Sequence, residues 1–375
     1  MEWKEVRLGD ILNFRRGHDL PHSAMKPGNI PVAGSNGVIG YHDTATPIKP
    51  ILTIGRSGNV GKPYFYEEAW AHNTTLYVDD FKGNDPKFLY YLCQTMPFAN
   101  LGGGSAVPTL NRNHIHPLET KIPVKVEDQC RIVSILSSLD RKIELNNKIN
   151  ADLEEMAQAI FKNWFVDFEP FKDGKFVDSE LGMIPEGWKV GTLGDITKNK
   201  SAKVKEKNDV KVLSPVTTGE LVLSEEYFTK QVFSSSIAKY KIVNKGEFAY
   251  NPARVNIGSL GRNEFDFDGC VSPVYVVFSV LEGYENYFDL FRKTDFFKDS
   301  VASLAIGGVR QSLSYDDLSL IETIIPSENI VEKFNNLYNQ MKKTIKANKQ
   351  ENSRLSLLRD TLLPRLMSGE LEVPE

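Results

Sequence analysis

The chain has 375 residues, of which 41% are hydrophobic and 25% are charged, and its formal net charge is −4. The length exceeds what one hydrophobic core usually supports, and the composition excludes a wholly disordered or fibrous protein. The net charge excludes a generic polyanion binder, so any contact with nucleic acid must come from local patches. The longest apolar stretch, 271–281, is too short to span a membrane. The scattered cysteines Cys93, Cys130 and Cys270 favour a reducing cytoplasm over a disulfide framework or a zinc site.

The sequence is internally repeated. Trp3 begins the segment Trp-Lys-Glu-Val-Arg-Leu-Gly-Asp-Ile, and Trp188 begins the matching Trp-Lys-Val-Gly-Thr-Leu-Gly-Asp-Ile. Further along, the pattern Gly-x-x-Gly followed by a cation occurs at 58–62 and again at 258–262. Repetition on this scale predicts two related domains. Because the first half carries all six histidines, the two domains are expected to share a framework and differ in detail.

Residues 1–126 are predicted to form the first domain, with mixed α and β structure. Apolar runs such as 51–54 and 75–78 are rich in β-branched and aromatic residues and are separated by Gly, Pro and Asn, which favours strands. The stretch 85–96 has the pattern of a short helix. Residues 188–327 are expected to repeat this design as the second domain.

A heptad pattern follows each domain. From Ile132 onwards, apolar residues and asparagines recur at alternating spacings of 4 and 3, and the same spacing recurs from Phe334 onwards. A mean period of about 3.5 residues is typical of a coiled-coil seam. The pattern predicts two helices of about 40 residues, each about 60 Å long, at 127–168 and within 328–375.

Prolines and glycines mark where these helices should end. Pro170 disfavours helix before it, so the first helix is expected to end near Phe168. Residues 169–187 contain several glycines and a proline and predict a loop-like linker. The second helix is expected to kink at Pro364 and to stop by Gly369.

The connectivity predicts how the helices pack. The first helix carries the chain from the first domain to the second, and the second helix leaves the second domain with a matching apolar stripe to bury. It can bury that stripe on the first helix only by running back along it. The expected α+β fold is therefore two mixed α/β domains joined by two long antiparallel coiled-coil helices, with a pseudo-twofold axis.

Asparagines near the middle of the seam predict its register. Under the pseudo-twofold axis, Asn146 should face Asn352 and Asn150 should face Asn348. A buried Asn is costly unless its amide is paired, and such pairs can fix the register of two helices. The alternative is that these asparagines are solvated where the helices splay.

Two related but different domains on a rigid rod favour a device that reads two unlike features at a fixed separation. One turn of a DNA duplex spans about 34–36 Å, so a rod of about 60 Å could hold two readers over successive grooves. The site read would then be two different half-sequences with an unread gap between them.

At this point the sequence resembles a known family, the specificity subunits of type I restriction–modification systems. The similarity covers nearly the whole chain and rests on the two Trp-x4-Leu-Gly-Asp openings and on an ordered set of motifs. These motifs lie at 30–40, 54–62, 70–77, 159–165, 250–261, 271–275 and 362–369.

The resemblance implies a non-catalytic subunit with two target-recognition domains, each of which reads half of a bipartite site in double-stranded DNA. It implies assembly with two modification subunits, which bind S-adenosylmethionine and methylate adenine. It also implies restriction subunits that use ATP and magnesium. No cofactor is expected in this chain, and a cytoplasmic location without membrane contact is expected. The rival interpretation is a protein-binding coiled-coil adaptor with two ligand-binding lobes.

Glycine-rich segments supply the candidate DNA contacts. Glycines allow close approach to phosphate, Arg side chains fit guanine, and Asn side chains fit adenine. The alternative is that these are ordinary glycine turns with structural hydrogen bonds. The candidate residues are Arg56, Ser57, Asn59, Lys62, Asn73, Arg112, Arg254, Asn256, Ser259, Arg262, Arg310 and Gln311.

Other motifs give weaker predictions. No Cys or acid stands at ligand spacing beside His72, His114 and His116, so no metal site is predicted. The segment 251–254 lacks the stacking aromatic residue of an adenine methyltransferase, so no catalytic residue is predicted. An aromatic block could either cap the coiled coil against the domains or dock a modification subunit. Its members are Phe161, Trp164, Phe165 and Phe168.

Overall fold

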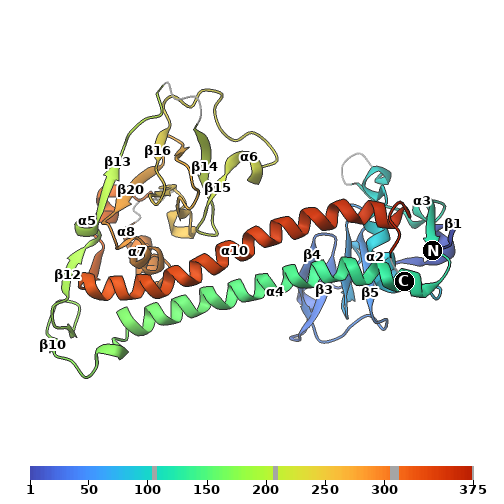
Figure 1. Cartoon of the computed structure of the whole chain (residues 1–375), viewed down its shortest axis with the longest axis horizontal. Helices are drawn as coiled ribbons and strands as arrows, with labels where there is room; N and C mark the ends of the chain where they lie inside the picture. Colours follow the sequence, from blue (N-terminus) through green and yellow to red (C-terminus); the bar gives the residue numbers. More distant parts are fainter. Residues whose placement is uncertain (104–107, 206–209, 305–311, 374–375) are drawn as a thin grey trace. The chain divides into compact units, whose positions relative to one another are not determined.

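A computed structural model of the chain describes residues 1–103, 108–205, 210–304 and 312–373. The chain divides into two compact units (Figure 1). Unit 1 comprises Met1–Lys148 and Asn348–Glu375, and unit 2 comprises Ile149–Ala347. Two helices of 40 residues, α4 (Val126–Phe165) and α10 (Glu328–Met367), each contribute one part to each unit. The mixture of long helices and sheets confirms the predicted α+β class.

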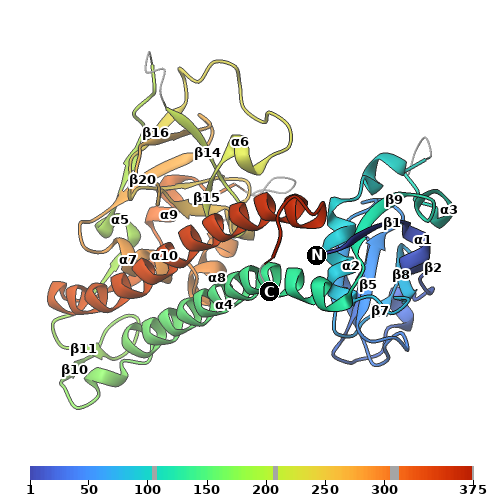
Figure 2. The ribbon, with the colours of Figure 1, turned by 45° about the vertical axis from the view of Figure 1, so that its right-hand side comes forward.

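Unit 1 is built from a four-stranded sheet in the order β2-β8-β5-β6, a three-stranded sheet in the order β4-β3-β7, and the antiparallel pair β1-β9 (Figure 2). Its strands are β1 (Trp3–Arg7), β2 (Asn13–Arg16), β3 (Ile30–Gly34), β4 (Gly37–His42), β5 (Ile51–Gly55), β6 (Pro63–Tyr66), β7 (Trp70–Ala71), β8 (Thr75–Asp80) and β9 (Glu119–Pro123). Its short helices are α1 (Leu8–Ile11), η1 (His22–Ala24), α2 (Pro86–Thr95), η2 (Phe98–Leu101) and α3 (Arg112–Ile115).

Unit 2 repeats the main sheet, in the equivalent order β13-β20-β17-β18, and has a second sheet in the order β15-β14-β19-β16. Its strands are β10 (Phe176–Val177), β11 (Ile184–Pro185), β12 (Lys189–Thr192), β13 (Thr197–Lys200), β14 (Lys211–Pro215), β15 (Leu221–Leu223), β16 (Lys241–Val243), β17 (Phe248–Tyr250), β18 (Leu260–Arg262), β19 (Gly269–Val271), β20 (Val276–Val280) and β21 (Glu322–Ile325). Its short helices are η3 (Glu169–Phe171), α5 (Leu193–Ile196), α6 (Ser224–Tyr227), η4 (Val255–Ile257), α7 (Glu285–Phe291), α8 (Asp295–Leu304) and α9 (Tyr315–Ser319).

The repeated Leu-Gly-Asp-Ile segments form the same local structure in both units. Each makes a single helical turn, α1 or α5, directly after a short strand. Asp10 accepts a hydrogen bond from the amide of Arg7 at 3.2 Å, and Asp195 accepts one from the amide of Thr192 at 2.7 Å. A short polar side chain that satisfies a free amide at a helix start stabilises that turn. The shared motif is therefore a structural one.

Both long helices end close to the predicted positions. The first ends at Phe165, somewhat before the predicted Phe168. Phe168 itself has a left-handed conformation with φ 55°, which an α-helix cannot include. The second continues past Pro364 to Met367. Gly369 follows with φ 77°, and a Cβ atom on it would lie only 2.8 Å from the Trp3 ring. Glycine is therefore required there by both conformation and packing.

Within each unit, the parts of α4 and α10 lie side by side and run in opposite directions (Figures 1 and 2). In unit 1, the Asn146 amide donates to Asn352 at 2.9 Å and to Glu351 at 2.7 Å. Hydrogen bonds from Asn146 and Lys142 lower the pKa of Glu351. Asn150 and Asn348 belong to different units, and their pairing stays a prediction.

A buried polar contact joins α2 to both long helices in unit 1. The fully buried Tyr91 donates its hydroxyl to Asp140 at 2.5 Å, and Arg359 donates to the other oxygen of Asp140 at 2.9 Å.

Replacing Asp140 with alanine is expected to lower the free energy of unfolding by about 1–3 kcal/mol, because the Tyr91 hydroxyl loses its acceptor. Urea titration followed by circular dichroism measures this change. The exposed Glu144, replaced by alanine, is the control and should change stability by less than about 0.5 kcal/mol.

Candidate nucleic-acid interface

The glycine-rich loop of unit 1 follows β5 and is closely packed. Gly58 and Gly61 have φ of 87° and 81°, and a Cβ atom on Gly55 would lie 1.8 Å from the Asn59 carbonyl oxygen. The Gly61 amide donates to the Gly55 carbonyl at 2.7 Å, and the Gly55 amide donates to Lys62 at 3.0 Å. Because the amides of both Gly55 and Gly61 are bonded inside the loop, neither is available for a contact with DNA.

Several candidate side chains of unit 1 come together at the end of β5. The guanidinium of Arg56 is half-buried and donates to the Asn73 carbonyl at 3.4 Å. The Asn73 amide donates to Asp19. Ser57 forms a β-bridge with Thr109, which lies shortly before the candidate Arg112 in the chain. Arg56, Ser57 and Asn73 thus lie at the same end of the inner strands β5 and β8.

The remaining candidates of unit 1 are exposed. Asn59 and Lys62 lie on the loop, with the Lys62 ammonium 5.3 Å from the centre of the Tyr64 ring. Arg112 begins α3, and its guanidinium donates to the Phe14 carbonyl at 3.5 Å. These cations are placed where they could reach a ligand.

Two of the candidate histidines of unit 1, His116 and His72, have structural roles. His116 accepts a hydrogen bond from the Phe14 amide at 3.0 Å, and burial followed by the charge of Arg112 lowers its pKa. Burial also lowers the pKa of His72, whose ring hydrogen-bonds to Thr74 at 2.9 Å. Among the described residues, no three His, Cys, Asp or Glu side chains gather as metal ligands would.

Unit 2 exposes only some of its candidates. Arg254 and Asn256 are exposed on the turn after β17. Ser259 is 1% exposed and donates its hydroxyl to the Pro215 carbonyl at 2.8 Å, so its position favours the structural alternative. Arg262 donates to Asn286 at 2.9 Å and is likewise engaged inside the unit. Arg310 and Gln311 lie outside the described residues.

Comparison with known proteins decides the class. A family model described as a type I restriction modification DNA specificity domain matches residues 1–155. The type I restriction enzyme MjaIX specificity subunit of Methanocaldococcus jannaschii is 33% identical over 305 residues, which cover 77% of this chain and 70% of that protein. The chain belongs to the type I restriction enzyme specificity subunits. This membership confirms the family, and the non-catalytic class, predicted from the sequence.

Two further similarities extend over nearly the whole specificity subunit. The HindI specificity subunit of Haemophilus influenzae is 26% identical over 460 residues, which cover 98% of this chain and 94% of that protein. The crystal structure of a type I S subunit from M. genitalium has a TM-score of 0.61 and 15% identity, covering 98% of this chain and 96% of that one. This structure shows that the fold is shared.

The aromatic block of the specificity subunit lies in and around the core of unit 2. Phe161 and Phe165 are 2% and 4% exposed, and Trp164 and Phe168 are half-buried against the same core. The Phe165 ring lies 5.0 Å from that of Phe334. This placement favours the capping alternative. The block also borders a cavity of about 740 Å³ between the end of α4 and α8.

The turn between β3 and β4 contains no residue predicted for the site, yet it borders the glycine-rich loop. The carbonyl oxygen of Ser35 lies 3.3 Å from the position of a Cβ atom on Gly55, and its hydroxyl lies 3.7 Å from one on Gly58. The following Asn36-Gly37 pair is a hairpin signal, but only the tertiary structure shows that this hairpin borders the glycine-rich loop.

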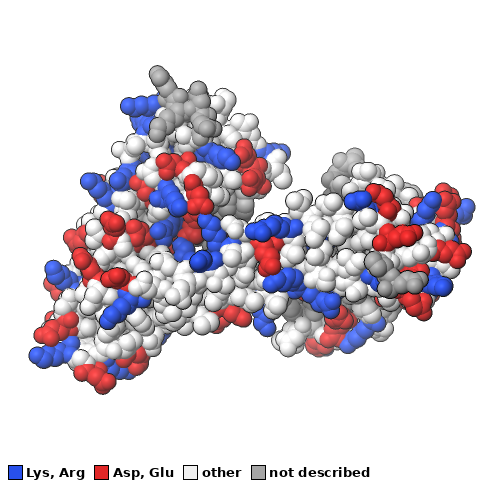
Figure 3. Space-filling model, in the orientation of Figure 1, with Lys and Arg blue, Asp and Glu red and all other residues white. Residues whose placement is uncertain are grey.

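The surface charge of the specificity subunit is mixed. On the face shown in Figure 3, Lys and Arg alternate with Asp and Glu over both units. In the part of the chain that the structure describes, no helix has the length and apolar character needed to cross a membrane.

Proposed function

We propose that this chain gives a type I restriction–modification complex its DNA sequence specificity, with each unit reading one half of a bipartite site. One observation carries the proposal. The main sheets of the two units have equivalent strand orders, and the turns after the equivalent strands β5 and β17 present Arg with Asn. Arg56 with Asn59 and Asn73 would read one half-sequence, and Arg254 with Asn256 the other, since these side chains match guanine and adenine edges.

The long helices would set the distance between the half-sequences. In each unit their parts run antiparallel, which is the packing that a spacer between two pseudo-symmetric domains requires. The proposed parts are the first target-recognition domain at 1–126, the first spacer helix at 127–168, a linker at 169–187, the second target-recognition domain at 188–327, and the second spacer helix with its tail at 328–375.

The proposed partners supply the chemistry. Two modification subunits would bring S-adenosylmethionine, and restriction subunits would bring ATP and magnesium. The cavity beside Phe161, Phe165 and Phe168, with the exposed Val166 at its rim, is a candidate docking point for a modification subunit. The proposed role on cellular DNA favours a location in the cytoplasm, and so do the few, scattered cysteines.

The test of the proposal is the methylation pattern of the complete complex. The modification subunit is assayed on genomic DNA with and without this chain, and methylated adenines are mapped by long-read sequencing. We expect methylation at one bipartite, asymmetric sequence only when the chain is present. Methylation with no added sequence preference would contradict the proposal and favour a protein-binding adaptor.

Replacing Arg254 with alanine is expected to relax one half-sequence by about 1–3 kcal/mol of discrimination if the guanidinium reads a base. The other half-sequence should remain intact. Arg56, replaced by alanine, is the matched variant in unit 1 and should relax the opposite half. Methylation mapping measures both effects. An unchanged motif in the Arg254 variant would assign this side chain to the scaffold.

A further inference from the structure

A loop of unit 2 is tied to α10 by ion pairs. The loop joins β18 to β19 and carries Glu264, which pairs with Lys342, and Asp266, which pairs with Lys346 at 2.9 Å. Asp266 also pairs with Lys245 at 2.8 Å. Exposed ion pairs contribute little stability individually, so these contacts alone would not fix the loop on the helix.

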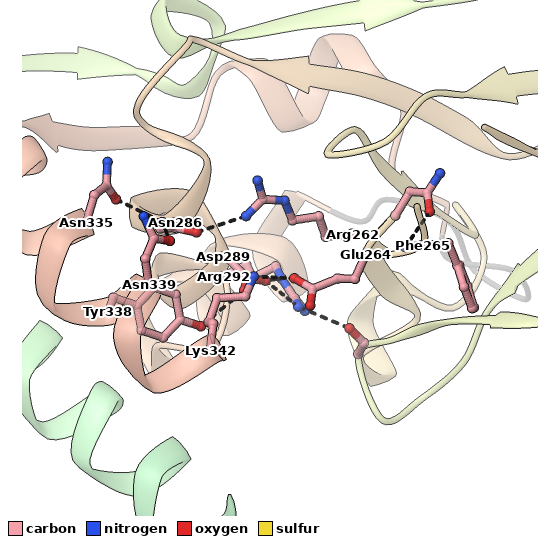
Figure 4. A network of polar contacts seen from close by, with 12 residues as sticks. Arg262, Glu264, Phe265, Asn286, Asp289, Arg292, Asn335, Tyr338, Asn339 and Lys342 are labelled. Atoms are coloured by element: carbon pink, nitrogen blue, oxygen red, sulfur yellow. Dashed lines mark hydrogen bonds and ion pairs between the residues drawn. The ribbon is translucent and has the colours of Figure 1, made fainter. Parts of the chain in front are cut away.

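A buried amide lies near the ion pairs, and both its N–H groups and its oxygen are hydrogen-bonded (Figure 4). Asn286 on α7 is 7% exposed, and its amide group donates to Asn335 at 3.0 Å and to Asn339 at 2.9 Å. Its carbonyl oxygen accepts from Arg262 at 2.9 Å. The Asn335 amide in turn donates to the Gly283 carbonyl at 2.6 Å. Because a buried amide is costly when unpaired, these bonds favour one relative position of α7 and α10.

A buried acid adds a second attachment between the same helices. Tyr338 on α10 donates to Asp289 on α7 at 3.4 Å, and Arg292 pairs with Asp289 at 2.7 Å. Burial alone would raise the pKa of Asp289, but the charges of Arg292, Lys293 and Lys342 hold it below its usual value. Asp289 is therefore ionised, and it keeps both partners at neutral pH.

The network leads to the turn proposed to read DNA. Arg292 donates to the Leu260 carbonyl on β18 at 2.8 Å, and Arg262 of the same strand bonds Asn286. Directly before Leu260, the Ser259 amide donates to the Arg254 carbonyl at 3.1 Å. Hydrogen bonds therefore connect α10 through α7 to β18, and the backbone of β18 leads directly to Ser259 and the turn that carries Arg254.

We propose that five residues of α10, which we call the α10 clamp, are positioning residues that fix the angle of the reading turn about the spacer helix. The clamp consists of Asn335, Tyr338, Asn339, Lys342 and Lys346. This inference rests on the proposed function. It adds the reason why the gap between the two half-sequences has a single length. A domain that could rotate about α10 would meet its half-sequence at several gap lengths.

Unit 1 uses a different attachment, the contact of Tyr91 and Arg359 with Asp140. Here the acid lies on the long helix, whereas in unit 2 the long helix carries Lys342 and the recognition domain carries Glu264. Each domain is therefore attached to the long helices through its own set of residues. Variants of the clamp leave the attachment of unit 1 unchanged.

Charge reversal of Lys342 provides the test in the complete complex. With Lys342→Glu, the fraction of methylated sites whose gap is one base pair longer or shorter is expected to rise about fivefold. Both half-sequences should stay the same, which separates positioning from base reading. The double variant Lys342→Glu with Glu264→Lys restores an opposite-charge pair and should narrow the gap distribution again in part, because the new carboxylate at position 342 still lies near the buried Asp289. Lys172→Glu, which breaks an exposed ion pair with Glu169 elsewhere in unit 2, is the control.

A second variant keeps the test valid if Lys342→Glu fails to fold. Asn339→Ala removes one acceptor of Asn286 without placing a new charge near Asp289, and it should broaden the gap distribution in the same direction. Folded, active variants with an unchanged gap distribution would overturn the clamp and leave the proposed function standing. So would a changed half-sequence in either variant. A wild-type complex that methylates no bipartite site would overturn the proposed function, and the clamp with it.

Discussion

Replacing Phe165 with alanine is expected to lower the free energy of unfolding of unit 2 by about 3–5 kcal/mol. The side chain is 4% exposed. Its ring lies 5.0 Å from Phe161, 5.1 Å from Tyr287 and 5.8 Å from Trp188. Truncation removes these contacts and leaves a cavity that rigid aromatic neighbours cannot fill. Urea titration followed by circular dichroism measures the loss.

The adjacent Val166 is the control for this variant. It is 51% exposed, and its replacement by alanine should change stability by less than about 0.5 kcal/mol. Comparing the Phe165 and Val166 variants also distinguishes whether the aromatic block caps the helices or docks a modification subunit. If Phe165→Ala keeps its stability but loses binding to the modification subunit, the block docks a partner and does not cap the helices.

Lengthening both long helices by seven residues is expected to lengthen the gap between the half-sequences by about three base pairs. The insertions lie between Lys148 and Ile149 and between Ala347 and Asn348, where the chain passes from one unit to the other. Seven residues add about 10.5 Å, and one base pair spans about 3.4 Å. Because seven residues make one heptad, or two turns of a coiled-coil helix, the apolar seam returns to the same face after the insertion.

Methylation mapping of the complete complex measures this change. The same insertion in α4 alone is the control, because it leaves the helices unequal in length and should reduce methylation without producing a new defined gap. A lengthened pair with the original gap, or with altered half-sequences, would contradict the proposed spacer role of the helices.

The long helices were predictable because their information is local and repeated. A seam such as that from Ile132 to Trp164 encodes both the length of a helix and the side that it buries, and α4 spans Val126–Phe165 where 127–168 was predicted. The end of α4 was less predictable. Pro170 only limits how far the helix can run, whereas the left-handed Phe168 depends on how the chain packs beyond it.

The candidate site was predictable in residue type and only partly in arrangement. The glycine pattern indicated Arg56 and Arg254 through neighbours in the chain. The same pattern could not separate them from Ser259, whose hydroxyl bonds a carbonyl 44 residues away. The α10 clamp left no sequence signal, since Lys342 and Glu264 are 78 residues apart and each resembles an ordinary surface charge.

The amino-acid sequence by itself determined the duplication, the two helices, the family and the residue types suited to reading DNA, because all of these are written in spacing along the chain. The tertiary structure alone decided which of those side chains are exposed, which are used for internal bonds, and how α10 is attached to its domain. The physical reason is that burial and hydrogen-bond partnership depend on residues distant in sequence. A polar side chain such as Asn286 gains its role only when folding brings its partners to it.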